Sequence, residues 1–82
     1  MGSLYKECKK CKGCIAIFGQ YVGFIICEDC KIWIQEDEKP MFQKHIVRCP
    51  TCSFTVSFQC MGKIDTRCVK CDCEMFEGVI QK

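Results

Sequence analysis

The sequence predicts a small all-β fold built from a duplicated unit, and three observations lead to this prediction. The chain has 82 residues, 11 of which are cysteines, so it can form only a modest hydrophobic core. Its short apolar segments are rich in β-branched and aromatic residues, and none keeps a helical period. Eight of the cysteines occur in two copies of one pattern. A chain this small usually needs disulfides or metal ions in addition to its core.

The duplicated pattern consists of two C-x-x-C pairs separated by fifteen residues, and the second copy lies 41 residues after the first. Two residues between cysteines let one tight turn offer both sulfurs to one ion, and zinc takes four tetrahedral ligands. Two such quartets in register predict a fold stabilised by two Zn²⁺ ions. The predicted ligands are Cys8, Cys11, Cys27 and Cys30 in the first copy, and Cys49, Cys52, Cys68 and Cys71 in the second.

The cysteine count and the N-terminal residues favour a reducing compartment, the cytoplasm or the nucleus. Eleven is an odd number, and residues 1–7 contain no apolar signal segment, so a secreted disulfide scaffold is not expected. The longest apolar run, residues 15–26, is interrupted by glycine and polar residues and is too short to span a bilayer. We therefore expect no membrane association.

The charge argues against a protein that binds nucleic acid through charge alone. The formal net charge is +2 when every thiol is counted as neutral. Eight thiolates and two Zn²⁺ ions change that value by −4, so the metal-loaded protein carries about −2. Domains that bind nucleic acid through a broad basic surface are far more basic than this.

The first C-x-x-C turn, or knuckle, allows two interpretations because Cys8, Cys11 and Cys14 are evenly spaced. The strict repeat favours Cys8 with Cys11. So does Gly13, which follows two places later, where the turn needs a permissive backbone to aim N–H groups at sulfur. The sequence therefore predicts Cys8 and Cys11 as the ligand pair, with Cys11 and Cys14 as the alternative.

Three strands are expected in the first copy. Residues 15–18 and 21–26 are predicted to form a hairpin around Gly19 and Gln20. Residues 31–35 alternate and predict a third strand, with Ile32 and Ile34 on one face and Trp33 on the other.

A linker at residues 35–40 is expected to separate the two copies, so the predicted units are residues 1–40 and 41–82. Residues 41–48 predict a strand that enters the second copy. Residues 54–59 alternate between apolar and polar side chains and predict a half-buried strand. A turn is expected at residues 61–65, and a last short strand at residues 74–81.

Knuckles placed around a hairpin and followed by a third strand resemble the zinc ribbon, and this chain is similar to a tandem of two. The resemblance rests on the eight predicted ligands, and the segment from Cys49 to Cys52, with Pro50 and Thr51, is nearest to the usual ribbon knuckle. Zinc ribbons are common in RNA polymerase subunits, transcription factors, ribosomal proteins and small viral regulators. The resemblance therefore implies a role in nucleic-acid machinery.

A cross-braced arrangement, as in RING and related domains, is the alternative. In a cross-brace the first and third pairs share one metal ion, and the second and fourth pairs share the other. The spacings permit it, but His45 lies four residues before Cys49 and not at the usual ligand position just ahead of the third pair. A self-contained repeat also favours sequential sites.

Four further potential ligands remain after the two quartets, which is arithmetically one more tetrahedral site. Cys60 lies eight residues beyond Cys52 on a predicted strand, about 26 Å along it, whereas Cys73 directly follows its own pair. We therefore expect two zinc ions, with a third as the alternative, and we expect Cys60 to be a small core residue. The four leftover residues are Cys14, His45, Cys60 and Cys73.

All-cysteine quartets leave no open metal position, so the sequence predicts a non-enzymatic protein. We expect a zinc-binding adaptor or regulator that docks on a protein partner in a larger assembly for transcription or RNA handling, with Trp33 as a contact residue. One alternative is direct RNA or DNA binding, which should be weak at a charge of about −2. The other is a RING-like ubiquitin ligase, which requires the cross-brace. The basic residues predicted to contact a partner are Lys9, Lys10 and Lys12.

Overall fold

The structure, a computed structural model, describes residues 3–18, 21–61 and 64–77. Over these residues it contains nine strands and no helix, which confirms the all-β prediction. The four-stranded sheet has the order β1 (Ser3–Glu7), β2 (Cys14–Phe18), β7 (Asp65–Cys68), β8 (Cys73–Glu74). The five-stranded sheet has the order β4 (Ile32–Gln35), β3 (Val22–Cys27), β6 (Thr55–Cys60), β5 (Gln43–Arg48), β9 (Phe76–Glu77). Within the described ranges no helix could cross a membrane.

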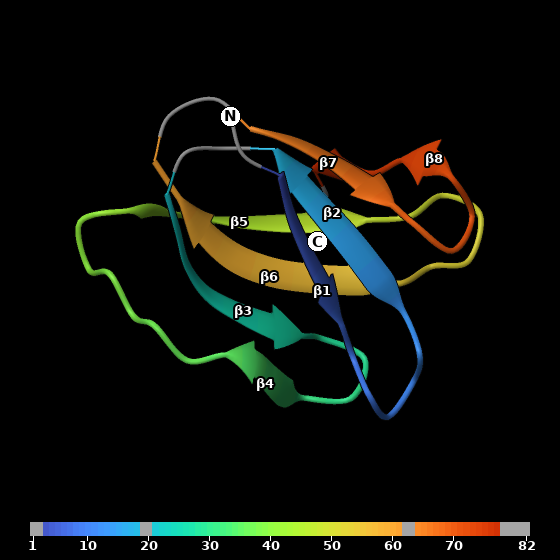
Figure 1. Cartoon of the computed structure of the whole chain (residues 1–82), viewed down its shortest axis with the longest axis horizontal. Helices are drawn as coiled ribbons and strands as arrows, with labels where there is room; N and C mark the ends of the chain where they lie inside the picture. Colours follow the sequence, from blue (N-terminus) through green and yellow to red (C-terminus); the bar gives the residue numbers. More distant parts are fainter. Residues whose placement is uncertain (1–2, 19–20, 62–63, 78–82) are drawn as a thin grey trace, which may run out of the picture.

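Each sheet combines strands from both copies of the repeat (Figure 1). The β1–β2 hairpin pairs with β7 and β8 of the second copy, and the β3–β4 hairpin pairs with β5 and β6. At these joins Ile15 lies opposite Cys68, and Ile26 lies opposite Ser57. A shift of 41 residues carries β1–β4 onto β5–β8 and therefore carries one sheet onto the other. Residues 41 apart are called counterparts below.

The predicted hairpin between residues 15–18 and 21–26 is wrong. Both strands form, but β2 belongs to the four-stranded sheet and β3 to the five-stranded sheet, and the predicted turn at residues 19–20 lies outside the described residues. The knuckles themselves join neighbouring strands, because residues 8–13 connect β1 to β2 and residues 28–31 connect β3 to β4. The remaining edges of β2 and β3 are then free to pair with the other copy.

Other expected strands fare differently. The strands at residues 31–35 and 41–48 are confirmed as β4 and β5. In place of one last strand at residues 74–81 there are two short ones, β8 and β9, and residues 78–82 lie outside the described part. Strands β1 and β7 were not predicted from the sequence. The repeat could have revealed them, since β1 is the counterpart of β5 and β7 is the counterpart of β3.

The core lies between the two sheets. Ile15 and Ile17 come from the four-stranded sheet, and Val56 and Phe58 come from the five-stranded sheet, and all four are fully buried. Cys60 is also fully buried, as expected for a small core residue. The knuckle cysteines complete one end of this core, which places the candidate metal ligands at the junction of the sheets.

The expectation of a half-buried strand at residues 54–59 is wrong, because β6 is buried on both faces, including Ser57 and Gln59. The chain after β4 passes over the outer face of β6, and Gln59 Oε1 accepts a hydrogen bond of 2.7 Å from the Lys39 backbone N–H. A polar side chain can be buried when it is bonded in this way.

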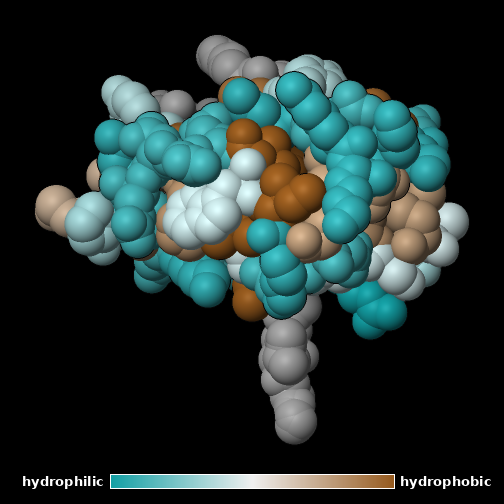
Figure 2. Space-filling view, turned by 90° about the horizontal axis from the view of Figure 1, so that it is seen from below, coloured by the Kyte–Doolittle hydropathy of each residue, from teal (hydrophilic) through white to brown (hydrophobic). Residues whose placement is uncertain are grey.

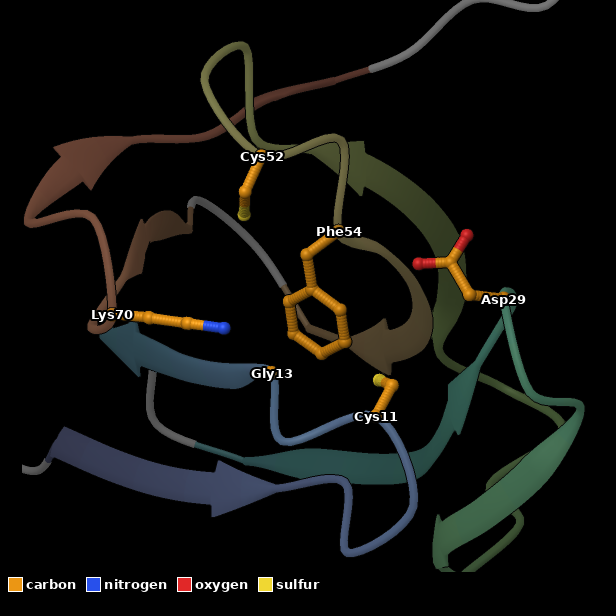
Figure 3. Close-up of a pocket in the computed structure, with 6 residues that line it drawn as sticks. All are labelled: Cys11, Gly13, Asp29, Cys52, Phe54 and Lys70. Atoms are coloured by element: carbon orange, nitrogen blue, oxygen red, sulfur yellow. The ribbon is translucent and has the colours of Figure 1, made fainter.

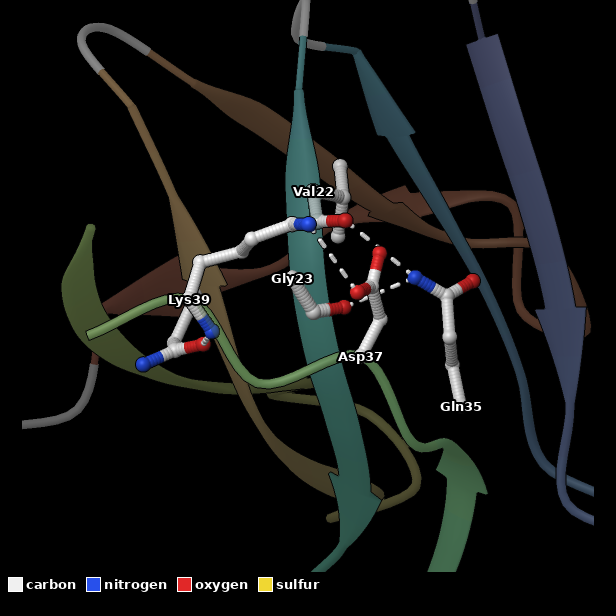
Figure 4. Close-up of polar contacts among 6 residues, drawn as sticks. Val22, Gly23, Gln35, Asp37 and Lys39 are labelled. Atoms are coloured by element: carbon white, nitrogen blue, oxygen red, sulfur yellow. Dashed lines mark hydrogen bonds and ion pairs between the residues drawn. The ribbon is translucent and has the colours of Figure 1, made fainter. Parts of the chain in front are cut away.

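The segment expected to be a linker is fastened to the five-stranded sheet (Figure 4). The Gln35 side-chain amide donates to the backbone oxygens of Val22, at 3.2 Å, and Gly23, at 2.7 Å. A Cβ at Gly23 would lie 2.5 Å from Gln59 Oε1, so the Gln59 side chain would have to move away from the Lys39 N–H that it accepts from. The proposed boundary after residue 40 falls between β4 and β5 and stays a prediction.

Candidate metal centres

Each predicted ligand pair occupies a turn between two adjacent antiparallel strands. The first cysteine of each pair is fully buried at or just after the end of a strand, and the second is more accessible. The first pair joins β1 to β2, the second β3 to β4, the third β5 to β6 and the fourth β7 to β8. The buried first cysteines are Cys8, Cys27, Cys49 and Cys68.

All four knuckles have the same backbone conformation. The residue after the second cysteine has a positive φ in every case, between 54° and 66°, although none of the four is a glycine. In three knuckles the N–H of this residue donates to the carbonyl oxygen of the first cysteine at 2.7–2.9 Å. Non-glycine residues rarely adopt this conformation unless their surroundings hold it. The four residues are Lys12, Lys31, Ser53 and Asp72.

The role predicted for Gly13 therefore belongs to Lys12, which carries the left-handed conformation. Gly13 lacks a side chain for another reason. A Cβ at this position would lie 2.4 Å from the ring of Phe54, which is buried against it. Phe54 is the counterpart of Gly13, so the ring of one copy occupies space left by the other.

The eight predicted ligands form two groups that fit tetrahedral zinc. In each group the four Sγ atoms lie within 4.8 Å of one another. Sulfurs bound to zinc at about 2.3 Å in a tetrahedron lie about 3.8 Å apart. The Sγ atoms of Cys11 and Cys27 are 3.7 Å apart, and so are those of their counterparts Cys52 and Cys68. The donor set and its spacing thus fit a closed four-thiolate zinc site.

The grouping is sequential, because the first and second pairs share one site and the third and fourth pairs share the other. The cross-braced alternative is therefore wrong, and with it the RING-like interpretation. A cross-brace would require Cys8 to lie beside Cys49, but these residues begin the knuckles of different groups. The pair of Cys8 with Cys11 is also the one that the structure assembles, while Cys14 opens β2.

The thiols of a quartet do not ionise independently. Burial acts to raise the pKa of Cys8, but the backbone N–H groups of Cys11 and Lys10 lower it to about 7. Its counterpart Cys49 behaves alike: burial opposes ionisation, the N–H of Cys52 favours it, and the pKa falls to about 6. Burial raises the pKa of Cys27 to about 12. A divalent cation would favour the thiolate form of every ligand, so metal binding releases protons.

Each candidate centre connects the two sheets. In the first centre Cys8 and Cys11 belong to a hairpin of the four-stranded sheet, whereas Cys27 and Cys30 belong to a hairpin of the five-stranded sheet. The second centre makes the same connection with the sheets exchanged. A metal ion at either centre would therefore hold the two layers of the core together.

A small pocket of about 120 Å³ lies between the two centres, and its lining consists of three counterpart pairs (Figure 3). Backbone bonds brace this region, from Glu28 N–H to the Thr55 oxygen at 2.9 Å and from Val69 N–H to the Cys14 oxygen at 3.0 Å. These two bonds are counterparts of each other. The lining pairs are Cys11 with Cys52, Gly13 with Phe54, and Asp29 with Lys70.

The structure does not bring the four leftover ligands together. His45 Nδ1 lies 2.9 Å from Glu77 Oε2, and its ring stacks on Phe58. Cys60 is buried at the end of β6, and Cys14 begins β2. Among the described residues, the two quartets are the groups of three or more potential ligands that come within reach of one ion.

Cys73 lies next to the second centre. Its Sγ atom is 3.3 Å from Cys49 Sγ and 3.7 Å from the Thr51 hydroxyl. At the first centre the counterpart of Cys73 is Ile32, which carries no sulfur. The two centres thus have the same kind of ligand set, but only the second has the Cys73 sulfur beside it.

Trp33 lies on β4, an outer strand of the five-stranded sheet, with 45 % of its surface exposed. Its ring meets the ring of Phe24 edge-on, with the centroids 5.4 Å apart. A cavity of about 320 Å³ is lined by Trp33, Glu36 and Glu38. Apolar atoms gather in the middle of the molecular face seen from below, with hydrophilic atoms around them (Figure 2).

The predicted basic contacts Lys9, Lys10 and Lys12 are exposed in the β1–β2 turn.

No protein family, curated protein or solved structure was found to match this chain. The two four-cysteine centres and their geometry are therefore the basis for assigning a function.

Proposed function

We propose that this protein is a non-enzymatic interaction module, stabilised by two zinc ions, that docks on a protein partner in the cytoplasm or nucleus. The closed sulfur quartets support a structural rather than a catalytic role, because zinc with four protein ligands has no position for a reacting water. The resemblance to zinc ribbons suggests that the partner belongs to an assembly for transcription or RNA handling.

The observation that carries the proposal is the exposed side chain of Trp33. A tryptophan that is only half buried on an outer strand loses much of the benefit of burial, and tryptophan is enriched among the anchors of protein interfaces. The cavity beside it gives a partner side chain a place to insert. Glu36 and Glu38 make the surroundings acidic, which favours a basic or mixed partner surface.

Direct nucleic-acid binding is the second candidate, and the observation that favours it is the exposed lysine-rich turn between β1 and β2. This turn offers three positive charges, Lys9, Lys10 and Lys12, beside a centre with a net negative charge once zinc is bound. A few phosphate contacts support only weak, salt-dependent binding. Protein docking is therefore the preferred function.

Affinity capture and oligonucleotide titration on two variants test the proposal. We expect Trp33→Ala to lose captured subunits of a transcription or RNA-handling assembly, whereas Lys9→Ala with Lys10→Ala keeps them. Tyr21→Ala is the matched control, since Tyr21 is also an exposed aromatic residue, at 61 %. Zinc content should stay at that of the parent in every variant. Tight, steeply salt-dependent oligonucleotide binding that the double lysine change abolishes would contradict the proposal and favour the second candidate.

A further inference from the structure

We propose that the cavity beside Trp33 binds the side chain of an arginine from an extended segment of the partner. This inference rests on the proposed function and specifies the chemistry of the partner. It follows from the aromatic wall, the acidic wall, the attachment of the acidic segment to the sheet and the free edge of β4.

The aromatic wall is the ring of Trp33. The ring is held in place by its edge-on contact with Phe24, whose own side chain is buried. Trp33 is paired with Ile26 of β3, which fixes the side of the sheet from which it projects. The exposed part of the ring borders the cavity. A planar indole face with a fixed orientation is the best aromatic surface for a cation.

The acidic wall is formed by Glu36 and Glu38, two residues apart in the segment that follows β4. Alternate residues of an extended chain point to the same side, so both carboxylates can face the cavity. Asp37, between them, forms an ion pair of 3.2 Å with Lys39. Among the described residues the ion pairs include neither Glu36 nor Glu38, which leaves two negative charges for a ligand.

The backbone that carries the acidic wall is attached to the sheet at both ends. Gln35 attaches the start of the acidic segment to the backbone of Val22 and Gly23, and Lys39 attaches its end to Gln59 (Figure 4). Glu36 and Glu38 lie between these two attachment points. A site that is already ordered loses less conformational entropy on binding.

Arginine fits this combination better than other side chains. Its planar guanidinium can stack on an indole while its N–H groups form paired hydrogen bonds with a carboxylate. An apolar side chain would bury the carboxylates without a partner, and an acidic one would be repelled. A volume of about 320 Å³ lies at the lower limit of small-molecule pockets, which suits one side chain.

The position of β4 favours an extended partner segment. Among the described strands β4 ends the five-stranded sheet, so the backbone groups on its outer side are available to another strand. A peptide that adds to such an edge gains main-chain hydrogen bonds and places alternate side chains on one face. One of these side chains would enter the cavity beside Trp33.

Peptide titration of the zinc-loaded protein tests the inference, with Trp33 as the reporter because it is the only tryptophan. The probe is a short acetylated peptide of alternating valine and threonine with one central arginine. Two comparison peptides carry lysine or neutral citrulline in its place. We expect the arginine peptide to shift the tryptophan emission and to bind about tenfold more tightly than the citrulline peptide, with lysine in between. Isothermal titration calorimetry measures the same affinities without the fluorophore.

Two variants show whether the acidic wall is responsible for the preference for the arginine peptide. Glu36→Gln with Glu38→Gln should abolish the preference for arginine while zinc content stays unchanged. Glu74→Gln, which removes an exposed carboxylate from β8, is the control and should have no effect. Equal affinity for the arginine and citrulline peptides, equal affinity for arginine and lysine, or an equal loss with Glu74→Gln would overturn the inference.

The same data separate this inference from the proposed function. If Trp33→Ala loses the captured partner but the arginine peptide binds no better than citrulline, the arginine site is wrong and the docking function stands. If the arginine preference holds but Trp33→Ala still captures the assembly, the site is correct and the proposed function is wrong.

Discussion

The two metal centres have the same ligand geometry but different surroundings. The Sγ atoms of Cys11 and Cys27 are 3.7 Å apart in the first centre, and those of Cys52 and Cys68 are 3.7 Å apart in the second. In every knuckle the residue after the second cysteine has a left-handed backbone conformation. The first knuckle of the first centre carries Lys9 and Lys10, where the second centre has Pro50 and Thr51. The second centre has Cys73 beside it, where the first has Ile32.

This difference shows that the repeat preserves backbone geometry rather than side-chain identity. The left-handed position is filled by lysine twice, by serine once and by aspartate once, and never by glycine. In three of the four knuckles a hydrogen bond back to the first cysteine, together with the sulfur quartet, holds a conformation that these residues would otherwise rarely adopt. Side chains outside the quartets were then free to diverge between the centres.

Metal removal should have the largest effect on stability, and it should destabilise the fold around both centres equally. Each centre joins a hairpin of one sheet to a hairpin of the other, so without metal the two layers lose their connection at this end. A structural zinc contributes on the order of 10 kcal/mol or more, comparable to the whole stability of a small domain. We expect exhaustive chelation to abolish the near-ultraviolet circular dichroism. Retention of that signal in metal-free protein would refute this prediction.

Removing one centre tests whether the two copies of the repeat stabilise each other. Cys68→Ser combined with Cys73→Ser, which also removes the neighbouring thiol, should release the second metal ion and increase hydrogen exchange in β2 of the first copy, because Ile15 pairs with Cys68 across the sheet. Cys60→Ser is the control and should bind as much zinc as the parent, as measured by native mass spectrometry. If exchange rose only in residues 41–82 of the double variant, the two copies would be independent.

The ligand grouping and most of the strands could be predicted from the sequence because both depend on local patterns. Two C-x-x-C pairs with equal spacing define a quartet, and alternating apolar residues define a strand. The strand partners were not accessible, since β2 and β3 present buried side chains on both faces and could pair with strands of either copy. Pairing across the copies is decided by long-range packing, such as Ile15 beside Cys68, which no local pattern encodes.

The surroundings of Trp33 were also only partly accessible. Its role as a contact residue was expected, but the segment after it was expected to be a linker. Its attachment depends on the Gln35 amide reaching two backbone oxygens of β3 and on Gly23 leaving room for Gln59. These contacts join residues 12 to 36 positions apart, and single-sequence patterns do not reveal them.

The thiol of Cys73 should serve the second centre as a reserve ligand. The effect of removing it should be smaller than that of removing a whole centre. Cys73 Sγ already lies 3.3 Å from Cys49 Sγ, so a small movement can bring it to the metal when another ligand is lost. We expect Cys71→Ser to keep its second zinc against a competing chelator. Its counterpart variant, Cys30→Ser, should lose the first zinc, because Ile32 cannot replace a sulfur.

Cobalt substitution reports the ligands directly. In Cys71→Ser the cobalt absorption of the second centre should remain that of four sulfur ligands. In Cys30→Ser the cobalt absorption of the first centre should change to that of three sulfur ligands. The control is Cys71→Ser with Cys73→Ser, which should behave like Cys30→Ser. Equal zinc loss from the two single variants would show that Cys73 is only a neighbour of the centre and that the two centres are equivalent.

The smallest effect is expected at Gly13 and Phe54, where the two copies meet between the centres. A Cβ at Gly13 would lie 2.4 Å from the Phe54 ring, and the ring is too well buried to move away freely. Gly13→Ala should therefore lower the free energy of unfolding by roughly 1–3 kcal/mol, the usual cost of overpacking, while both zinc ions stay bound. Denaturant titration with zinc present measures this change.

A double-mutant cycle isolates the contact between the two positions. In a Phe54→Ala background the space beside Gly13 is empty, so adding the Gly13→Ala methyl group should cost little, and the coupling energy should exceed about 1 kcal/mol. The Phe54→Ala change itself destabilises the core, which is why the cycle compares differences rather than single values. Additive effects would mean that Gly13 and Phe54 act independently. The presence of glycine in one copy and phenylalanine at the counterpart position of the other would then not reflect complementary packing between the two copies.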